Sequence, residues 1–171
     1  MKLTTKQLTL CAVLTAMALA LSYLENGFPL SLAIPLPGIK LGLANIVTVF
    51  ALYALGAGQA LLILLARCVL GAIFAGNVNA MIFSVMGGVT AMLVMIGLSR
   101  VKKLSIYGVS VGGAAAHNCG QVAAAILTLG NTAPLYYLPI LLGVSLFTGA
   151  LTGLIVACLF RGLAHTDIMK G

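Results

Sequence analysis

The sequence predicts an all-α protein, a bundle of six transmembrane helices that forms a single domain over residues 1–171. Hydrophobic residues make up 62% of the chain and charged residues only 6%, against roughly 25% charged residues in soluble domains. So few charges cannot cover a water-exposed surface, and most of the surface is therefore expected to face lipid. The long apolar runs 60–65 and 91–98 do not alternate with polar residues, which favours helices over a membrane-spanning barrel.

A membrane-spanning helix needs about 20 apolar residues. The apolar runs place six helices at residues 6–25, 39–55, 58–75, 78–99, 105–129 and 134–161. The longest interruption, residues 26–38, contains three prolines, which lack a backbone donor and restrict the residue before them. This segment is predicted to be a loop. Because the loop is itself apolar, we expect it to fold over the outer mouth of the bundle as a lid.

The first helix follows Lys2 and contains Lys6, a pattern that also begins signal peptides. No convincing cleavage site follows, so the helix is expected to be retained. Ala12, Ala16 and Ala20 stand four residues apart on it and form one smooth face. Small residues let helices approach closely. This face either packs inside the bundle or docks onto another membrane protein, and Gly149 and Gly153 offer a similar contact on the sixth helix.

The basic residues predict an orientation in the cytoplasmic membrane. With the amino terminus inside, seven of the nine Lys and Arg residues lie on the cytoplasmic side: Lys2, Lys6, Arg100, Lys102, Lys103, Arg161 and Lys170. Only Lys40 then lies outside, and Arg67 lies within the membrane. Multi-pass proteins carry their Lys and Arg in cytoplasmic loops. Both termini are therefore predicted to be cytoplasmic.

Arg67 is the first candidate site residue. It lies about eight residues into the third predicted helix, or ~12 Å from its start, near the middle of the bilayer. A charge at this depth is costly and marks a functional site by default. The chain has only two acidic residues, Glu25 and Asp167, and both are predicted to lie far away. Arg67 is either satisfied by backbone and side-chain oxygens or binds an anionic ligand.

The fifth predicted helix carries the most polar patch. His117 and Gln121 are four residues apart and share a face, and Asn118 is adjacent. All three are placed near mid-depth, where buried polar groups must be hydrogen-bonded. They either bond to neighbouring helices or line a cavity for a small polar ligand.

Further polar residues are predicted in the outer half of the bundle. Asn45 lies in the second helix, and Asn77 and Asn79 open the fourth helix, where asparagine also serves as a helix cap. Glu25 and Lys40 flank the proline-rich loop and form either part of a site or an ordinary solvated pair. Together with Arg67 and the patch on the fifth helix, these residues would surround an outward-facing pocket.

Several classes of function are disfavoured. The chain has no phosphate-binding P-loop motif, so any ATP hydrolysis would fall to partner proteins. Two distant acids cannot hold Mg²⁺ on a diphosphate, and two histidines with four scattered cysteines offer no haem or metal site. The basic residues form no stripe for nucleic acid. We therefore expect no catalysis, no cofactor and no metal in this chain.

Two motifs carry a resemblance to a known family. Residues 37–45, Pro-Gly-Ile-Lys-Leu-Gly-Leu-Ala-Asn, and residues 117–121, His-Asn-Cys-Gly-Gln, resemble the Gx transporter family, also called heptaprenyl diphosphate synthase component I. The resemblance covers essentially the whole chain. That family is similar to the S components of energy-coupling factor (ECF) transporters. Those are six-helix membrane proteins that bind a micronutrient and pair with a transmembrane T subunit and two ATPases.

The resemblance implies a role for each candidate residue. The face of Ala12, Ala16 and Ala20 matches the one through which S components contact the T subunit. The ligand would sit in the outer half under the loop of residues 26–38. The leading hypothesis is therefore an S component that binds a micronutrient or another small polar or anionic metabolite. Arg67, Lys40 and the patch on the fifth helix would contact the ligand, and partner ATPases would use the ATP.

Two alternatives stay open. One is a non-catalytic membrane subunit in isoprenoid or quinone metabolism, or in a flavin or quinone electron-transfer assembly. The flavin-attachment motif Ser/Thr-Gly-Ala-Thr is incomplete, because Thr148-Gly149-Ala150 is followed by Leu151. The synthase name also fits poorly, since aspartate-rich Mg²⁺ sites are absent from the sequence. The other alternative is a purely structural membrane partner.

Overall fold

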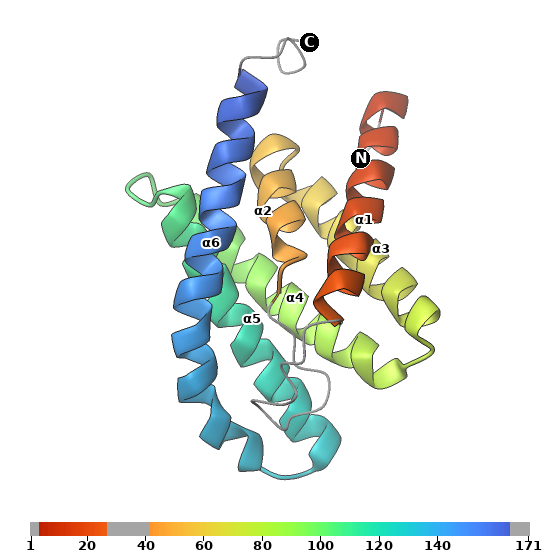
Figure 1. The fold of residues 1–171 in the computed structure, drawn as a ribbon, viewed down its shortest axis with the longest axis vertical. Helices are drawn as coiled ribbons and strands as arrows, with labels where there is room; N and C mark the ends of the chain where they lie inside the picture. The colour runs from red at the N-terminus through yellow and green to blue at the C-terminus, as the bar shows by residue number, and fades with distance from the viewer. Residues whose placement is uncertain (1–3, 27–41, 165–171) are drawn as a thin grey trace.

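A computed structural model describes residues 4–26 and 42–164 of the chain. These residues form six α-helices and one short 3₁₀ helix, and no strand occurs among them. The elements are α1 (Thr5–Asn26), α2 (Asn45–Ala54), α3 (Ala57–Ala75), α4 (Val78–Ser99), α5 (Ile106–Leu129), η2 (Ala133–Tyr137) and α6 (Leu138–Ala164) (Figure 1). The prediction of six helices in an all-α fold is confirmed. The expected lid falls outside the described residues, except for Asn26 at the end of α1.

Successive helices run in opposite directions along the bundle. In Figure 1, α1, α3 and α5 run downward and α2, α4 and α6 run upward. The start of α1, the α2–α3 and α4–α5 connections and the end of α6 therefore share one end of the molecule. Among the described residues, every Lys and Arg except Arg67 belongs to these segments, namely Lys6, Arg100, Lys102, Lys103 and Arg161. We call this end the basic end.

The second helix is shorter than the sequence predicts. We expected a helix over residues 39–55, but α2 begins only at Asn45. Gly42 adopts φ +84°, in the left-handed region, which a right-handed helix cannot continue through. Residues 42–44 form a turn instead, in which the carbonyl of Gly42 accepts from the amide of Asn45 at 2.8 Å.

Four segments are long and apolar enough to cross a membrane: Thr5–Glu25, Ala57–Ala75, Val78–Ser99 and Ala133–Ala164. The protein is therefore a multi-pass membrane protein. At ~1.5 Å per residue the ten residues of α2 extend about 15 Å, half of a hydrocarbon core of ~30 Å. The helix α5 has 24 residues but is not among the four segments. That all six helices cross the membrane stays a prediction.

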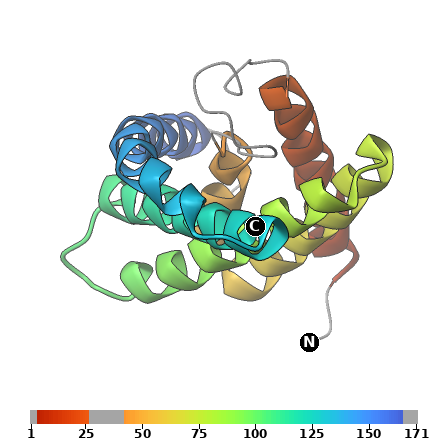
Figure 2. The same ribbon diagram turned by 90° about the horizontal axis from the view of Figure 1, so that it is seen from below.

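The short α2 lies in the centre of the bundle. It contacts α1, α3, α4 and α6, and both views show it between α1 and α6 (Figures 1 and 2). Seven of its ten residues are buried: Asn45, Ile46, Val47, Thr48, Val49, Ala51 and Leu52. All residues from Asn45 to Val49 are buried, so the polar groups near the start of α2 lie in the protein interior.

Glycines allow close contact among α4, α5 and α6. A Cβ atom on Gly120 of α5 would lie 2.6 Å from the backbone oxygen of Met86 in α4. A Cβ atom on Gly149 of α6 would lie 2.6 Å from the Cα of Val111 in α5. Because only glycine fits at such distances, these positions bring the helix backbones together. Of the two contacts that the sequence left open for Gly149, internal packing is therefore the one observed.

The first prediction concerns Gly149. We expect Gly149→Ala to destabilise the protein by about 1–3 kcal/mol, because the new methyl group would overlap the backbone of α5. Gly143→Ala in the same helix is the matched control, since nothing lies within 4 Å of its Cβ position. The free energy of unfolding in mixed detergent micelles measures both. Equal effects of the two substitutions would contradict the proposed close contact.

Candidate functional site

Arg67 is buried in the bundle and joins three helices. Its side chain, on the middle of α3, is 7% exposed. The guanidinium donates from Nη1 to Ser22 Oγ of α1 at 3.3 Å and from Nη2 to Asn45 Oδ1 of α2 at 3.4 Å. Its Nε is buried and has no hydrogen-bond partner among the described residues. Both acceptors are neutral, so these two hydrogen bonds bring no negative charge to the guanidinium.

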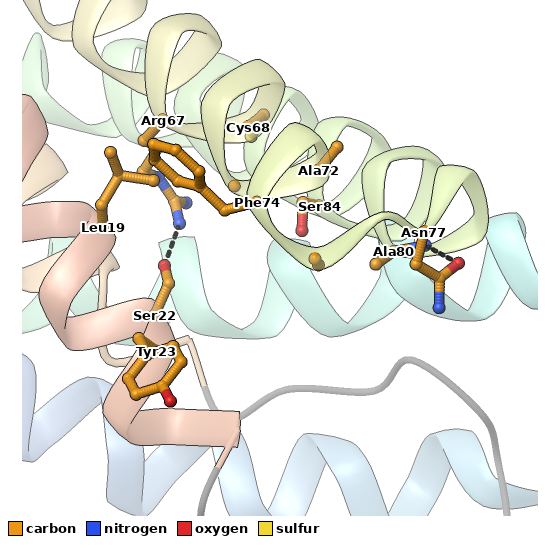
Figure 3. A pocket seen from close by; sticks show the side chains of 12 residues that line it. Leu19, Ser22, Tyr23, Arg67, Cys68, Ala72, Phe74, Asn77, Ala80 and Ser84 are labelled. Carbon is orange, nitrogen blue, oxygen red and sulfur yellow. Dashed lines mark hydrogen bonds between the residues drawn. The ribbon is translucent and has the colours of Figure 1, made fainter.

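A cavity of about 400 Å³ lies beside Arg67, between α1, α3 and α4. Figure 3 shows its lining residues and the bond from Arg67 to Ser22. The wall comes from the end of α1, the second half of α3 and the beginning of α4. These segments lie away from the basic end, because α1 and α3 finish and α4 starts at the opposite end of the molecule (Figure 1).

The turn before α2 forms the next part of the site. The backbone amide of Gly42 donates to Oε1 of Glu25, whose side chain is 5% exposed at the end of α1. A Cβ atom on Gly42 would lie 3.0 Å from Nδ2 of Asn45 and 3.4 Å from Cδ2 of His117. Gly42 therefore belongs to this turn for two reasons, its positive φ and its crowded surroundings.

The polar patch of α5 lies on the other side of this turn. His117 and Gln121 are both buried and face α4, where a Cβ atom on Gly87 would lie 2.9 Å from atoms of each. Asn118 points differently and donates from Nδ2 to the backbone oxygen of Leu141 in α6 at 2.8 Å. Asn118 thus ties α5 to α6, which is the structural role that its sequence position left open.

Five of the predicted binding residues come together in the interior. Asn45 links them, because it accepts a hydrogen bond from Arg67 and lies beside the turn at Gly42. The same turn donates to Glu25 and lies next to His117. Gln121 lies beside His117. We call Glu25, Asn45, Arg67, His117 and Gln121 the polar core. The inward orientation predicted for Arg67 and His117 is confirmed by their burial.

The remaining predicted site residues lie elsewhere. Asn77 caps α4, since its side-chain oxygen accepts from the amide of Ala80 at 3.2 Å, although it also lines the far end of the cavity. Asn79 is exposed. Lys40 lies outside the described residues. Of the two interpretations of Asn77, capping is therefore confirmed.

The alanine face of α1 is open. Ala12, Ala16 and Ala20 are all exposed, so the interpretation that they pack inside the bundle is wrong. The buried face of the same helix is formed by other residues, including Leu14 and Ala18.

Three residues of the site were not predicted from the sequence. Ser22 is three residues before Glu25 and shares its helix face, which was an available signal. Gly42 belongs to the first of the two family motifs, residues 37–45, but its contact with Glu25 could not be seen in the sequence. Gly87 stands among other glycines and alanines, and nothing in its neighbourhood distinguished it. The described residues contain no group of three or more His, Cys, Asp or Glu that could hold a metal ion.

The family model for heptaprenyl diphosphate synthase component I matches residues 14–159. The chain belongs to this family. The match spans both sequence motifs described above and all five residues of the polar core. Neither the curated proteins nor the solved structures contain a significant match to the chain.

The second prediction tests the turn at Gly42. We expect Gly42→Ala to destabilise the protein by about 1–3 kcal/mol, because it combines an unfavourable positive φ with crowding against Asn45. Gly76→Ala is the matched control: Gly76 has φ +59° but nothing within 4 Å of its Cβ position. Substituting Gly76 should therefore cost only the free energy of placing alanine at a positive φ. Unfolding in mixed micelles compares the two, and a larger effect at Gly76 would contradict the crowding.

Proposed function

We propose that this protein is the substrate-binding S component of an ECF-type importer for a micronutrient or another small polar or anionic metabolite. The observation that carries the proposal is the buried Arg67 beside an open cavity. The two hydrogen bonds that the structure describes for its guanidinium both go to neutral oxygens. A charge within a membrane bundle is costly and typically marks a ligand or ion pathway. In this role the chain binds and does not catalyse.

The proposed orientation places the basic end in the cytoplasm and the cavity in the outer half of the membrane. Cytoplasmic loops of multi-pass proteins are enriched in Lys and Arg, and the described Lys and Arg residues other than Arg67 gather at the basic end. A ligand would then enter the cavity from outside. All six helices would cross the membrane in this arrangement.

Import would need partners, because the sequence has no P-loop of its own. We propose that a transmembrane T subunit docks on the exposed face of Ala12, Ala16 and Ala20, and that two partner ATPases supply the energy. Small side chains on this face allow close helix contact. The whole bundle would reorient after capturing its ligand, and the smooth alanine face would permit that movement.

The family's name favours a second candidate, a membrane subunit that assists a separate prenyl-diphosphate synthase. A related version places the chain in a flavin or quinone electron-transfer assembly. Co-purification separates the candidates: an S component should be recovered with a T subunit and ATPases, and a synthase subunit with a soluble prenyltransferase. A flavin would be seen by in-gel fluorescence.

The third prediction tests the orientation. In a cysteine-free background, we expect Thr132→Cys in the α5–α6 connection to react with a membrane-impermeant maleimide in intact cells. Lys103→Cys in the α4–α5 connection should react only after permeabilisation. Both positions are exposed, so burial would not limit labelling. Permeabilised cells provide the control for total reactivity, and the reverse pattern would refute the orientation.

The fourth prediction tests the partner surface. We expect Ala16→Leu to reduce recovery of the T subunit in a pull-down about tenfold, which corresponds to about 1.4 kcal/mol. The larger side chain would keep the two helices apart. Ala150→Leu is the matched control, an exposed alanine on α6. If neither substitution changes recovery, the T subunit does not dock on this face.

A further inference from the structure

The cavity between α1, α3 and α4 has a composition that restricts its ligand. Its described wall supplies one cationic side chain, Arg67, and no acidic one. Most of the remaining wall is apolar, including Leu19, Gly71, Ala72 and Phe74. A ligand that matches this wall therefore combines one negative charge with an apolar body. A strongly polar or multiply charged ligand would leave the apolar wall unmatched and its further charges uncompensated.

The guanidinium of Arg67 retains free donors for such a ligand. Arginine has five N–H groups, and the two described hydrogen bonds use one on Nη1 and one on Nη2. Each of these two nitrogens therefore keeps one further N–H group. A carboxylate can accept hydrogen bonds from both terminal nitrogens of an arginine fork. Nε is buried away from the cavity and takes no part in this contact. A carboxylate would also bring the guanidinium the negative charge that its two neutral acceptors do not supply.

The volume indicates the size of ligand that suits the cavity. At about 400 Å³ the cavity is near the lower end of the ~300–1,000 Å³ range of small-molecule pockets. This volume suits a compact molecule with a single ring or a short chain.

We propose that this cavity binds a small amphiphilic monocarboxylate, with its carboxylate on Arg67 and its apolar body against α1 and α3. The proposal names a substrate class for the importer proposed above and rests on that function, but it can be measured on the isolated chain. Ser22 and Asn45 act as positioning residues, because they hold the guanidinium through Nη1 and Nη2. In the proposed orientation, the cavity lies in the outer half of the membrane.

The test compares three ligands that differ only in the head group: 3-phenylpropionate, 3-phenylpropanol and 3-phenylpropylamine. The full chain is placed in nanodiscs of phosphatidylcholine, and empty nanodiscs provide the subtraction for partitioning into lipid. We expect calorimetry to show that the carboxylate binds at least about tenfold more tightly than the alcohol, and that the amine does not bind. Equal affinity for the acid and the alcohol would overturn the proposal.

Variants assign the charge preference to the cavity. Arg67→Gln should remove the preference for the acid, whereas Arg67→Lys should retain part of it. Arg100→Gln, which alters a cation at the basic end, should change nothing. Ala72→Phe should abolish binding by filling the cavity, and Ala150→Phe on the exposed surface of α6 should not. If Arg67→Gln does not fold, the comparison of Ala72→Phe with Ala150→Phe still shows whether the ligand binds in this cavity. Binding that survives Ala72→Phe would overturn the proposal.

A lipid head group is the competing monoanion. Adding phosphatidylglycerol to the nanodiscs should leave the affinity for 3-phenylpropionate unchanged; competition would show that the cavity takes a lipid and would overturn the proposal. The test of the ligand class can be told apart from the test of the importer function. Absent binding with intact capture of the T subunit would refute only the substrate class. Intact binding with no T subunit recovered by the unchanged chain would refute the importer and leave the carboxylate site standing.

Discussion

Polar groups that a membrane protein carries into hydrocarbon must find their partners inside the protein, because lipid chains offer none. This constraint organises the bundle. Arg67 of α3 bonds to α1 and α2, the carboxylate of Glu25 in α1 accepts from the turn before α2, and Asn118 of α5 bonds to the backbone of α6. Each of these contacts crosses from one helix to another, so satisfying the polar groups also fixes how the helices pack.

The short α2 is the clearest consequence. Its amino end lies in the middle of the bundle, where an unsatisfied helix terminus would be costly. Glu25 places a carboxylate beside this end, and a negative charge suits the partial positive charge at a helix start. Arg67 meets the side chain of Asn45 at the first residue of the same helix. A single turn of backbone thus connects the buried acidic residue to the buried basic one.

The same arrangement explains why the two sequence motifs matter together. Gly42 of the first motif and His117 of the second are distant in the sequence but in contact in the fold. On the opposite side, Gly87 of α4 leaves room for the side chains of His117 and Gln121. The cavity lies beside Arg67, so a ligand bound there would be linked through Asn45 to the start of α2.

Much of the fold followed from local information. Apolar runs predicted five of the six helices to within a few residues, because a membrane helix satisfies its own backbone and needs only length and hydrophobicity. The start of α2 was missed because an apolar run does not reveal a positive φ at Gly42. The burial of Arg67 was also predictable, since a lone charge in an apolar segment has no stable place at the lipid surface.

The sequence by itself determined the class of the protein, the inward direction of its rare polar residues and the concentration of basic residues at helix ends, since each depends on the cost of charge in lipid. Only the tertiary structure decided their partners. It separated Asn118 and Asn77, which serve packing and capping, from Glu25, Asn45 and Arg67, which meet around one turn. Hydrogen bonds between helices depend on how those helices cross, and the spacing of residues within one helix carries no information about that.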